Sequence, residues 1–229
     1  MYGIIAAMES ERDALLEYMK DTRRERIYDM TFYIGLLGDK EVVLAQSGVG
    51  KVNAAFGTLV MIKAYAPALI FNTGVAGGLA EGIGQGDVAI AKDLVQHDMD
   101  TSPLGDPVGY ISGIDKVYLP CDHALVLAAK RAADKLGYTS YCGTVASGDA
   151  FIGTSEARTL ILSNFPSAVA CEMEGAACAH VACRAGVPFA AVRTISDSAN
   201  GDAPMDFGAF ALEAAKKNAR LVQEIFAQL

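Results

Sequence analysis

Short apolar runs alternate along the chain with longer segments in which apolar positions recur every three or four residues. The short runs predict strands that are buried on both faces, at residues 2–7, 68–73, 87–96, 140–147, 168–172 and 188–196. The longer segments predict helices, at residues 10–19, 51–65, 122–137, 155–165, 174–186 and 206–229. We expect Ser10 near the cap of the first helix. This alternation is typical of a mostly parallel sheet covered by helices on both faces.

One further pair of apolar runs, at residues 31–37 and 41–47, predicts a hairpin joined by the turn "GDK". No repeat, linker or low-complexity segment interrupts the pattern. The chain has 229 residues and 52% hydrophobic side chains, which suits one large core. The expected fold class is therefore α/β, a three-layer α/β/α sandwich around a mixed, mostly parallel twisted sheet, with residues 1–229 forming a single domain.

The charge balance and the cysteines exclude several functions. The formal net charge is −8, and no basic run is longer than "RRER" at residues 23–26, so a nucleic-acid binder is disfavoured. The five cysteines form no CxxC pair, which argues against a zinc site or a disulfide framework and favours a reducing compartment, the cytoplasm. The first residues, "MYGIIAAMESERD", resemble neither a signal peptide nor a membrane span.

Two glycine-containing stretches invite a phosphate-binding interpretation. "SGVGKVN", at residues 47–53, lacks the Ser or Thr that follows the lysine of a phosphate loop, because Val52 stands there. It also lacks the third glycine of a dinucleotide fingerprint, because Asn53 stands there. A tight strand-to-helix turn is the better interpretation. "NTGVAGG", at residues 72–78, follows a predicted buried strand, and its glycines would let backbone approach a ligand closely.

Polar side chains gather where the predicted strands end. In an open parallel sheet, ligands bind outside the carboxyl ends of the strands, so these side chains are expected at one rim. Several apolar side chains accompany them, and the whole set follows five strands: Met8 and Glu11, then Thr73, then Ser147, Asp149 and Phe151, then Glu172, Met173 and Glu174, and finally Arg193, Ser196 and Asp197.

Each of these residues also has an ordinary structural explanation. Glu11 and Glu174 would be favourable at the positive end of a helix, and Asp197 could be a turn residue. Arg193 would serve as a buried counterion for Glu172. The methionines and Phe151 would be core. Taken together the structural explanation is weaker, because all of these residues fall at the same kind of strand end.

Six motifs, in order and with the right separations, carry a family resemblance: "GIIAAMESE", "SGVGKVNAA", "NTGVAGGL", "SGDAFI", "EMEGAA" and "RTISDSA". The chain resembles the bacterial 5′-methylthioadenosine/S-adenosylhomocysteine nucleosidases, within the nucleoside phosphorylase superfamily. The resemblance covers nearly the whole chain. It implies a nucleoside phosphorylase-like fold and hydrolysis of the N-glycosidic bond between adenine and a 5′-thio-substituted ribose. Substrates would be methylthioadenosine, S-adenosylhomocysteine and 5′-deoxyadenosine, and the cofactor expectation is none.

The resemblance also implies roles for individual residues. Glu11 would activate water, Asp197 would protonate adenine N7, and Glu174 would hold the ribose hydroxyls. The Met173 backbone would lie near the ribose, Phe151 would stack on adenine, and the Ile152 backbone would contact the adenine edge. Ala76 and Gly77 would approach the ligand through backbone, and Arg193 and Ser196 would support the water and Asp197. The thioalkyl group would be surrounded by Met8, Val49, Phe151, Met173 and Phe207. Glu172 has no clear catalytic duty, and pairing with Arg193 is expected.

The chemistry explains why carboxylates are needed here. Cleavage passes through an oxocarbenium-like sugar, so a carboxylate against the ribose, as Glu174 would be, both orients the sugar and stabilises its positive charge. Asp197 must donate a proton, which requires a raised pKa, and an apolar strand end would raise it. Glu11 lies on another strand and would approach the opposite face, as displacement by water requires.

Rival functions differ in what they need from the site. A phosphorylase needs arginines or an anion nest, whereas the strand before "NTG" ends at Asn72. An AMP nucleosidase needs basic residues at the 5′ end, where the candidates are Met8, Val49 and Phe207. Futalosine hydrolysis is excluded less firmly. A non-catalytic nucleoside-binding module is disfavoured because Glu11 and Asp197 are both present.

Four further points concern the catalytic water, a metal, the oligomeric state and the 5′ substituent. Val75 stands where some relatives carry a hydroxyl residue near the catalytic water, which puts that contact in doubt. "HDMD", at residues 97–100, looks structural, and no metal is expected. The family is typically dimeric, so a homodimer is expected, with the loop "LGDPVGY" reaching toward the neighbour's site. The preference among 5′ substituents stays open.

Overall fold

The backbone of the protein is built around one mixed sheet. The computed structural model describes residues 1–200 and 203–229. Within them, the strands form a 10-stranded sheet in the order β10-β6-β8-β9-β5-β1-β4-β3-β2, with β7 paired to β6. The bounds are β1 (Tyr2–Ala6), β2 (Met19–Ile27), β3 (Met30–Leu37), β4 (Lys40–Gln46), β5 (Ile70–Gly78), β6 (Val88–Gln96), β7 (Leu119–Pro120), β8 (Ser140–Ser147), β9 (Ala168–Glu172) and β10 (Phe189–Asp197).

Part of this sheet closes on itself. β5 pairs in parallel with β1 and β10, and its last residues, Gly77 and Gly78, pair antiparallel with β9. β10 also pairs antiparallel with β6, and β6, β8 and β9 are parallel neighbours. Strands β5, β9, β8, β6 and β10 therefore form a closed circuit, while β4, β3 and β2 extend from β1 as an open wing. The mixed sheet confirms the expected fold class.

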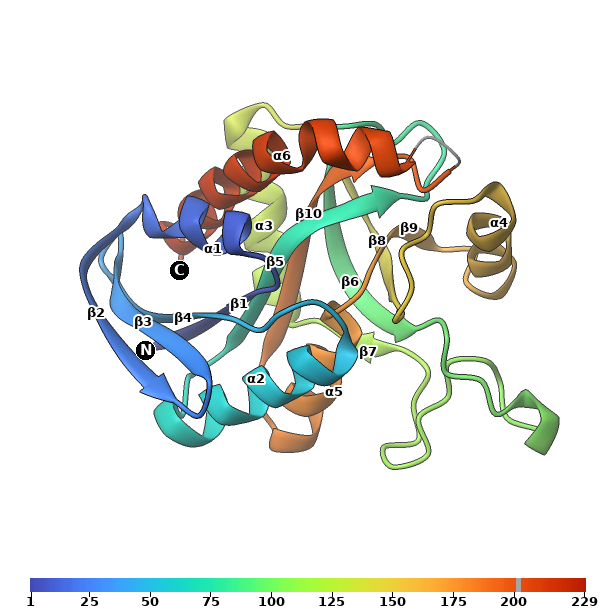
Figure 1. Cartoon of the computed structure of the whole chain (residues 1–229), viewed down its shortest axis with the longest axis horizontal. Helices are drawn as coiled ribbons and strands as arrows, with labels where there is room; N and C mark the ends of the chain where they lie inside the picture. Colours follow the sequence, from blue (N-terminus) through green and yellow to red (C-terminus); the bar gives the residue numbers. More distant parts are fainter. Residues whose placement is uncertain (201–202) are drawn as a thin grey trace.

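Helices cover both faces of the sheet, as the alternating pattern predicted (Figure 1). On one face lie α1 (Glu9–Leu16), α3 (His123–Leu136) and α6 (Ala203–Phe226), and on the other lie α2 (Lys51–Tyr65) and α5 (Gly175–Ala185). Each face has its own buried cluster: Leu15, Leu125 and Val222 belong to the first, and Met61 and Ala182 to the second. A sixth helix, α4 (Ser155–Asn164), packs at the side near β8 and β9.

The predicted end of the first helix is wrong, whereas Ser10 does lie near its cap. The helix predicted over residues 10–19 ends at Leu16, and Met19 begins β2. Its N-cap residue is Met8, so Ser10 lies inside the first turn. The strand β2 was not predicted, because "KDTRRER" shows no apolar alternation. It forms because its backbone pairs with β3 while most of its side chains stay exposed. The predicted hairpin is confirmed, with Leu37 opposite Lys40.

The connection between β6 and β7 projects from the body of the molecule (Figure 1). It contains a short 3-10 helix, Ser102–Leu104, and the stretch "LGDPVGY". Leu104 is 84% exposed at its tip. In the part of the chain that the structure describes, no helix is long and apolar enough to cross a membrane.

Candidate active site

A pocket of about 800 Å³, including its open mouth, lies at the carboxyl ends of several strands. The residues to which the family resemblance assigns a role line it, except Arg193: Met8, Glu11, Val49, Ala76, Gly77, Phe151, Ile152, Glu172, Met173, Glu174, Ser196, Asp197 and Phe207. Thr73, Ser147 and Asp149, also expected at this rim, do not line the pocket, because their side chains bond to Asn218, Glu172 and the Lys51 N–H. Ala7, Val75, Ala150 and Cys171 also line it. Of these four, Val75 was noted in the sequence only because some relatives carry a hydroxyl residue at that position. The other three are small residues at strand ends, which a sequence does not mark as ligand contacts.

Glu11 is held by backbone donors from two directions. Its Oε2 accepts the N–H groups of Ala7 and Met8, each at 2.9 Å, and its Oε1 accepts the N–H of Val75 at 2.9 Å. The bond to Met8 is that of a glutamate at the third helical position reaching back to the N-cap. Burial raises the pKa of Glu11, although the N–H groups of Met8 and Val75 act in the opposite direction. The result is an oriented carboxylate that takes up a proton more readily than usual.

A glycine makes room for this carboxylate. A Cβ at Gly74 would lie 2.4 Å from Glu11 Oε1 and 2.9 Å from its carboxyl carbon. Glycine at this position of "NTGVAGG" therefore lets β5 approach Glu11 closely enough for the next N–H, that of Val75, to bind it. The close backbone approach predicted for this stretch is present, although here the group approached is a side chain of the same protein.

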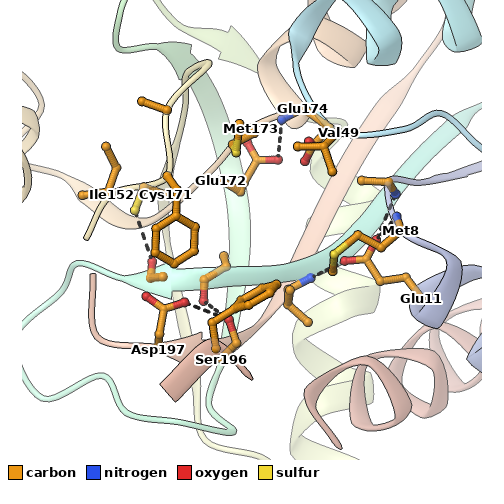
Figure 2. Close-up of a pocket in the computed structure, with 17 residues that line it drawn as sticks. Met8, Glu11, Val49, Ile152, Cys171, Glu172, Met173, Glu174, Ser196 and Asp197 are labelled. Carbon is orange, nitrogen blue, oxygen red and sulfur yellow. Dashed lines mark hydrogen bonds between the residues drawn. The ribbon is translucent and has the colours of Figure 1, made fainter. Parts of the chain in front are cut away.

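Asp197 lies across the pocket from Glu11 (Figure 2). Its Oδ2 accepts the Ser196 hydroxyl and its Oδ1 accepts the Ala199 N–H, both at 2.9 Å. Ala199 is buried and has a φ of 48°, in the left-handed region that costs an ordinary residue about 1–2 kcal/mol. Burial raises the pKa of Asp197 against these two hydrogen bonds. A carboxyl group with a raised pKa, facing a cavity, is suited to donate a proton.

Glu172 is occupied by the protein itself. It forms a salt bridge with Arg193 at 2.5 Å, accepts the Ser147 hydroxyl, and receives the N–H groups of Glu174 at 3.0 Å and Gly175 at 2.7 Å. Burial alone would raise the pKa of Glu172, but Arg193 and these hydrogen bonds outweigh it, so the pKa lies below its ordinary value. The expected pairing with Arg193 is confirmed.

Arg193 lies behind the pocket and not on its wall. Only 2% of the residue is exposed, and its guanidinium also donates to the Asn72 side chain and to the Val192 carbonyl. These partners, together with Glu172, satisfy a cation that sits in the middle of β10. Its expected support of a water molecule and of Asp197 stays a prediction.

Glu174 differs from Glu172 in what its oxygens bind. Its Oε1 accepts the Gly50 N–H at 2.8 Å, and its side chain makes no capping bond to the helix α5 that it precedes. The capping role considered for Glu174 is performed by Glu172. Burial and the neighbouring charge of Glu172 raise the pKa of Glu174 to about 8, although the Gly50 N–H acts against them. Glu174 thus has an oxygen left to bind a ligand hydroxyl.

Apolar side chains form the rest of the wall. The rings of Phe151 and Phe207 meet edge to face with centroids 5.7 Å apart, and Phe151 is 48% exposed. Met8 lies near Glu11, whereas Val49 and Met173 lie near Glu174 (Figure 2). An apolar wall next to three carboxylates suits a ligand with an apolar group at one end and hydroxyls at its centre.

The described residues contain no group of three or more His, Cys, Asp or Glu side chains that could hold a metal ion. In "HDMD", Asp98 pairs with Lys51 at 2.6 Å. A metal-independent reaction stays a prediction.

Comparison with known proteins agrees with this geometry. A family model described as the phosphorylase superfamily matches residues 1–227. A 5′-methylthioadenosine/S-adenosylhomocysteine nucleosidase from Shewanella loihica is 39% identical over 228 residues, covering 99% of this chain and 99% of the relative. The chain belongs to this nucleosidase family. The family resemblance noted in the sequence is thereby confirmed.

Two solved structures extend the comparison. The nucleosidase from Neisseria meningitidis, crystallised with methylthio-immucillin-A, superimposes with a TM-score of 0.97 at 38% identity and covers 100% of this chain and 99% of its own. A futalosine hydrolase from Helicobacter pylori superimposes with a TM-score of 0.95 at 33% identity, covering 100% of this chain and 97% of its own. The same fold therefore occurs in proteins named for different nucleoside substrates.

Proposed function

We propose that the protein hydrolyses the N-glycosidic bond of 5′-methylthioadenosine and S-adenosylhomocysteine, and also of 5′-deoxyadenosine, releasing adenine and the 5′-substituted ribose. The observation that carries this proposal is the pair Glu11 and Asp197. Both carboxyl groups are buried at opposite sides of one pocket, both have raised pKa values, and both are oriented by hydrogen bonds. Family membership supports the same conclusion.

In the proposed mechanism, deprotonated Glu11 takes a proton from a water molecule that attacks the anomeric carbon. Protonated Asp197 gives its proton to adenine N7, so the base leaves without negative charge. Positive charge develops on the ribose ring, and Glu174 binds the ribose hydroxyls and stabilises that charge. Three N–H donors keep Glu11 pointed at the water, so little reorganisation is needed during the reaction.

The other wall residues would recognise the two ends of the substrate. Phe151 would stack on adenine, with the Ile152 backbone at its edge, and Ala76 and Gly77 would approach through backbone. Met8, Val49, Met173 and Phe207 would surround the 5′-thioalkyl group, where burying apolar surface is favourable at about 25 cal/mol per Å².

Hydrolysis is favoured over phosphorolysis by the charges of the pocket. Neither Lys nor Arg is found among the described residues that line it, and Arg193 behind it is neutralised by Glu172. Phosphate binding would require such a cation or an open set of N–H donors. Three of those donors are taken by Glu11, whose charge would repel an oxyanion.

The decisive experiment measures adenine release from methylthioadenosine with and without phosphate, on wild type and on Asp197→Asn. We expect phosphate-independent release by wild type and a loss of roughly 10²–10⁴-fold in the variant, the range for general acid catalysis. Glu41→Gln, an exposed carboxylate on β4, is the matched control and should retain wild-type activity. Release that requires phosphate would make the protein a phosphorylase.

Futalosine hydrolysis is the second candidate, because a futalosine hydrolase is among the similar structures. Comparing kcat/KM for futalosine and methylthioadenosine separates the two. We expect methylthioadenosine to be preferred, since the small apolar wall near Met8 and Val49 suits a methylthio group. A preference for futalosine would reverse the assignment.

No cofactor or metal is proposed to take part. Activity should be unchanged after dialysis against EDTA. A loss that added Mg²⁺ or Zn²⁺ restored would contradict this proposal.

We further propose that each chain forms a single domain and that two chains form a homodimer. We also propose that the protein acts in the cytoplasm. Support for the dimer comes from the exposed apolar face of α2, where Val52 is 79%, Leu59 50% and Phe56 42% exposed. The ring of Tyr28, 74% exposed, lies 5.7 Å from that of Phe56. The projecting loop with Leu104 would reach the neighbour's site. Five free cysteines, two of them buried, support a reducing compartment.

Light scattering after size-exclusion chromatography tests the dimer. Wild type should have the mass of two chains at micromolar concentration, and Phe56→Lys should shift the equilibrium toward one chain. A wild-type monomer would contradict the proposal.

A further inference from the structure

Three polar residues outside the pocket form a closed cycle. Lys51 Nζ pairs with Asp98 Oδ1 at 2.6 Å, Asp98 Oδ2 accepts the Asp149 N–H at 2.9 Å, and Asp149 Oδ1 accepts the Lys51 N–H at 2.7 Å. Each comes from a different segment: the start of α2, the residues after β6, and the residues after β8. The cycle therefore ties together three loops that are distant in sequence.

The cycle is directly connected to the sugar side of the pocket. Gly50 precedes Lys51, and its N–H donates to Glu174 Oε1 at 2.8 Å. The first N–H groups of a helix have no partner within the helix, and α2 divides them between two carboxylates. Asp149 takes the N–H of Lys51, and Glu174 takes the N–H of Gly50. Asp149 thus acts as a distant cap that fixes the direction in which the Gly50 N–H points.

The cycle is also connected to the base side. Asp149 lies two residues before Phe151, which lines the pocket. Its N–H is held by Asp98, so Asp98 fixes the start of the segment that carries Phe151. A Cβ at Gly50 would lie 3.1 Å from Asp149 Oδ1, which shows how closely the two loops approach.

The charges favour this arrangement. Only 17% of the Lys51 side chain and 31% of the Asp98 side chain are exposed, so the ion pair is partly shielded from water. Burial alone would raise the pKa of Asp98, but the hydrogen bonds from Lys51 and the Asp149 N–H outweigh it, so the pKa lies below its ordinary value. Lys51 also donates to Gln96 Oε1 at 3.3 Å.

We propose that Lys51, Asp98 and Asp149 are positioning residues, of which Asp149 acts on one end of the substrate and Asp98 on both. Asp149 positions Glu174 through the Gly50 N–H and so serves the ribose. Asp98 positions both the α2 entry, through Lys51, and the Phe151 segment, so it serves ribose and adenine together. This inference rests on the proposed function, because it assigns the ribose to Glu174 and adenine to Phe151.

The test compares Asp149→Ala, Asp149→Asn and Asp98→Ala in the full-length protein. Calorimetry gives the affinity for adenine, and steady-state assays give kcat and KM for methylthioadenosine. Asp149→Ala should lower kcat about tenfold or more, as loss of a hydrogen bond to a charged group does, and leave adenine affinity within about twofold. Asp149→Asn keeps an acceptor oxygen and should recover most of kcat. Asp98→Ala should lower kcat and weaken adenine binding about tenfold.

Asp39→Ala is the matched control, because Asp39 is an exposed aspartate that pairs with a neighbouring lysine at 3.4 Å on the far wing of the sheet. It should match wild type in all three measurements. The inference is overturned if Asp149→Ala retains wild-type kcat, or if Asp149→Ala and Asp149→Asn lose kcat and adenine affinity equally, as a general loss of structure would cause. An inactive wild type would refute the proposed function instead. The affinity comparison would then use adenine and the uncleaved nucleoside, with the same expectations.

Discussion

The closed circuit of strands and the open wing bury different kinds of side chain. In the described chain, the buried polar strand residues lie on β5, β8, β9 and β10, among them Asn72, Ser147, Glu172 and Arg193. On the wing, β3 and β4 bury apolar side chains and β2 exposes its charges. Buried polar groups are costly unless they are fully paired, so they are retained where they are used. We therefore expect substitutions of buried residues in the circuit to affect activity, and substitutions in the wing to affect only stability.

The sharpest test of this comparison uses one ion pair from each region. Arg193→Met leaves Glu172 buried and unpaired, which should lower the free energy of unfolding by about 3–5 kcal/mol. Arg23→Met removes the exposed Arg23–Glu25 pair of the wing and should cost about 0–1 kcal/mol. Urea unfolding of both variants measures the difference. Equal midpoints would remove the distinction between the regions.

Alanine substitutions at two glycines should separate an effect on activity from an effect on stability. Alanine at Gly74 would place its Cβ 2.4 Å from Glu11 Oε1, so the base must move, and kcat should fall about 100-fold or more. Alanine at Gly35, on β3, would place its Cβ 2.6 Å from the Lys20 carbonyl and disturb only the pairing of β2 with β3. We expect Gly35→Ala to unfold at a lower temperature with kcat unchanged. A loss of kcat in Gly35→Ala with kcat retained in Gly74→Ala would contradict the assignment of catalysis to the circuit and stability to the wing.

The pH dependence of stability distinguishes Glu174 from carboxylates of the wing. Its pKa is about 8 in the fold and near 4.5 when unfolded, so the fold binds this proton more tightly. The stabilisation is complete below about pH 4.5 and is lost as pH rises through 8. Glu174→Gln should therefore raise Tm by at least about 2–4 °C at pH 8.5 and by less at pH 5, while abolishing activity.

Glu41→Gln, on the wing, is the control for this measurement. It should show the wild-type change of Tm with pH. If Glu174→Gln gave the same gain at both pH values, ionisation of Glu174 would not be the cause.

The smallest effects are expected at two residues with left-handed backbone. Asp21 on β2 has a φ of 51° and Ala199 beside Asp197 has a φ of 48°. Glycine at either relieves strain but adds freedom to the unfolded chain, so unfolding free energies should change by less than about 1 kcal/mol. Only Ala199→Gly should alter kcat, by a few-fold, because the Ala199 N–H orients Asp197. A loss of kcat in Asp21→Gly would count against the comparison.

Much of the fold was predictable because buried strands have continuous apolar sequences. The strand β2 was not, because its middle residues are charged and it forms only through its backbone bonds to β3. The closure of β5 with β9 and β10 was not predictable either. It depends on pairings between strands more than 90 residues apart, which leave no local pattern.

The candidate site was predictable as a group, because polar residues that follow buried strands converge on one rim. The partner of Glu172 could be inferred because a buried arginine needs a counterion. What could not be inferred are the backbone donors, such as the Gly50 N–H on Glu174, which joins residues 124 positions apart. Any residue except proline has an N–H, so sequence carries no record of which N–H is used.

The position of β5, paired with β1, β9 and β10, has a consequence for amide hydrogen exchange. Amides in its middle, around Asn72, should exchange with solvent deuterium only when the whole molecule unfolds. A ligand that binds only the folded state would raise the free energy of global unfolding by RT ln(1 + [L]/Kd). These amides would therefore exchange more slowly by the factor 1 + [L]/Kd. The Asp149 amide, held by a single side chain outside the sheet, would report local openings instead. The protein thus contains its own reference for separating ligand-induced rigidity from ligand-induced stability.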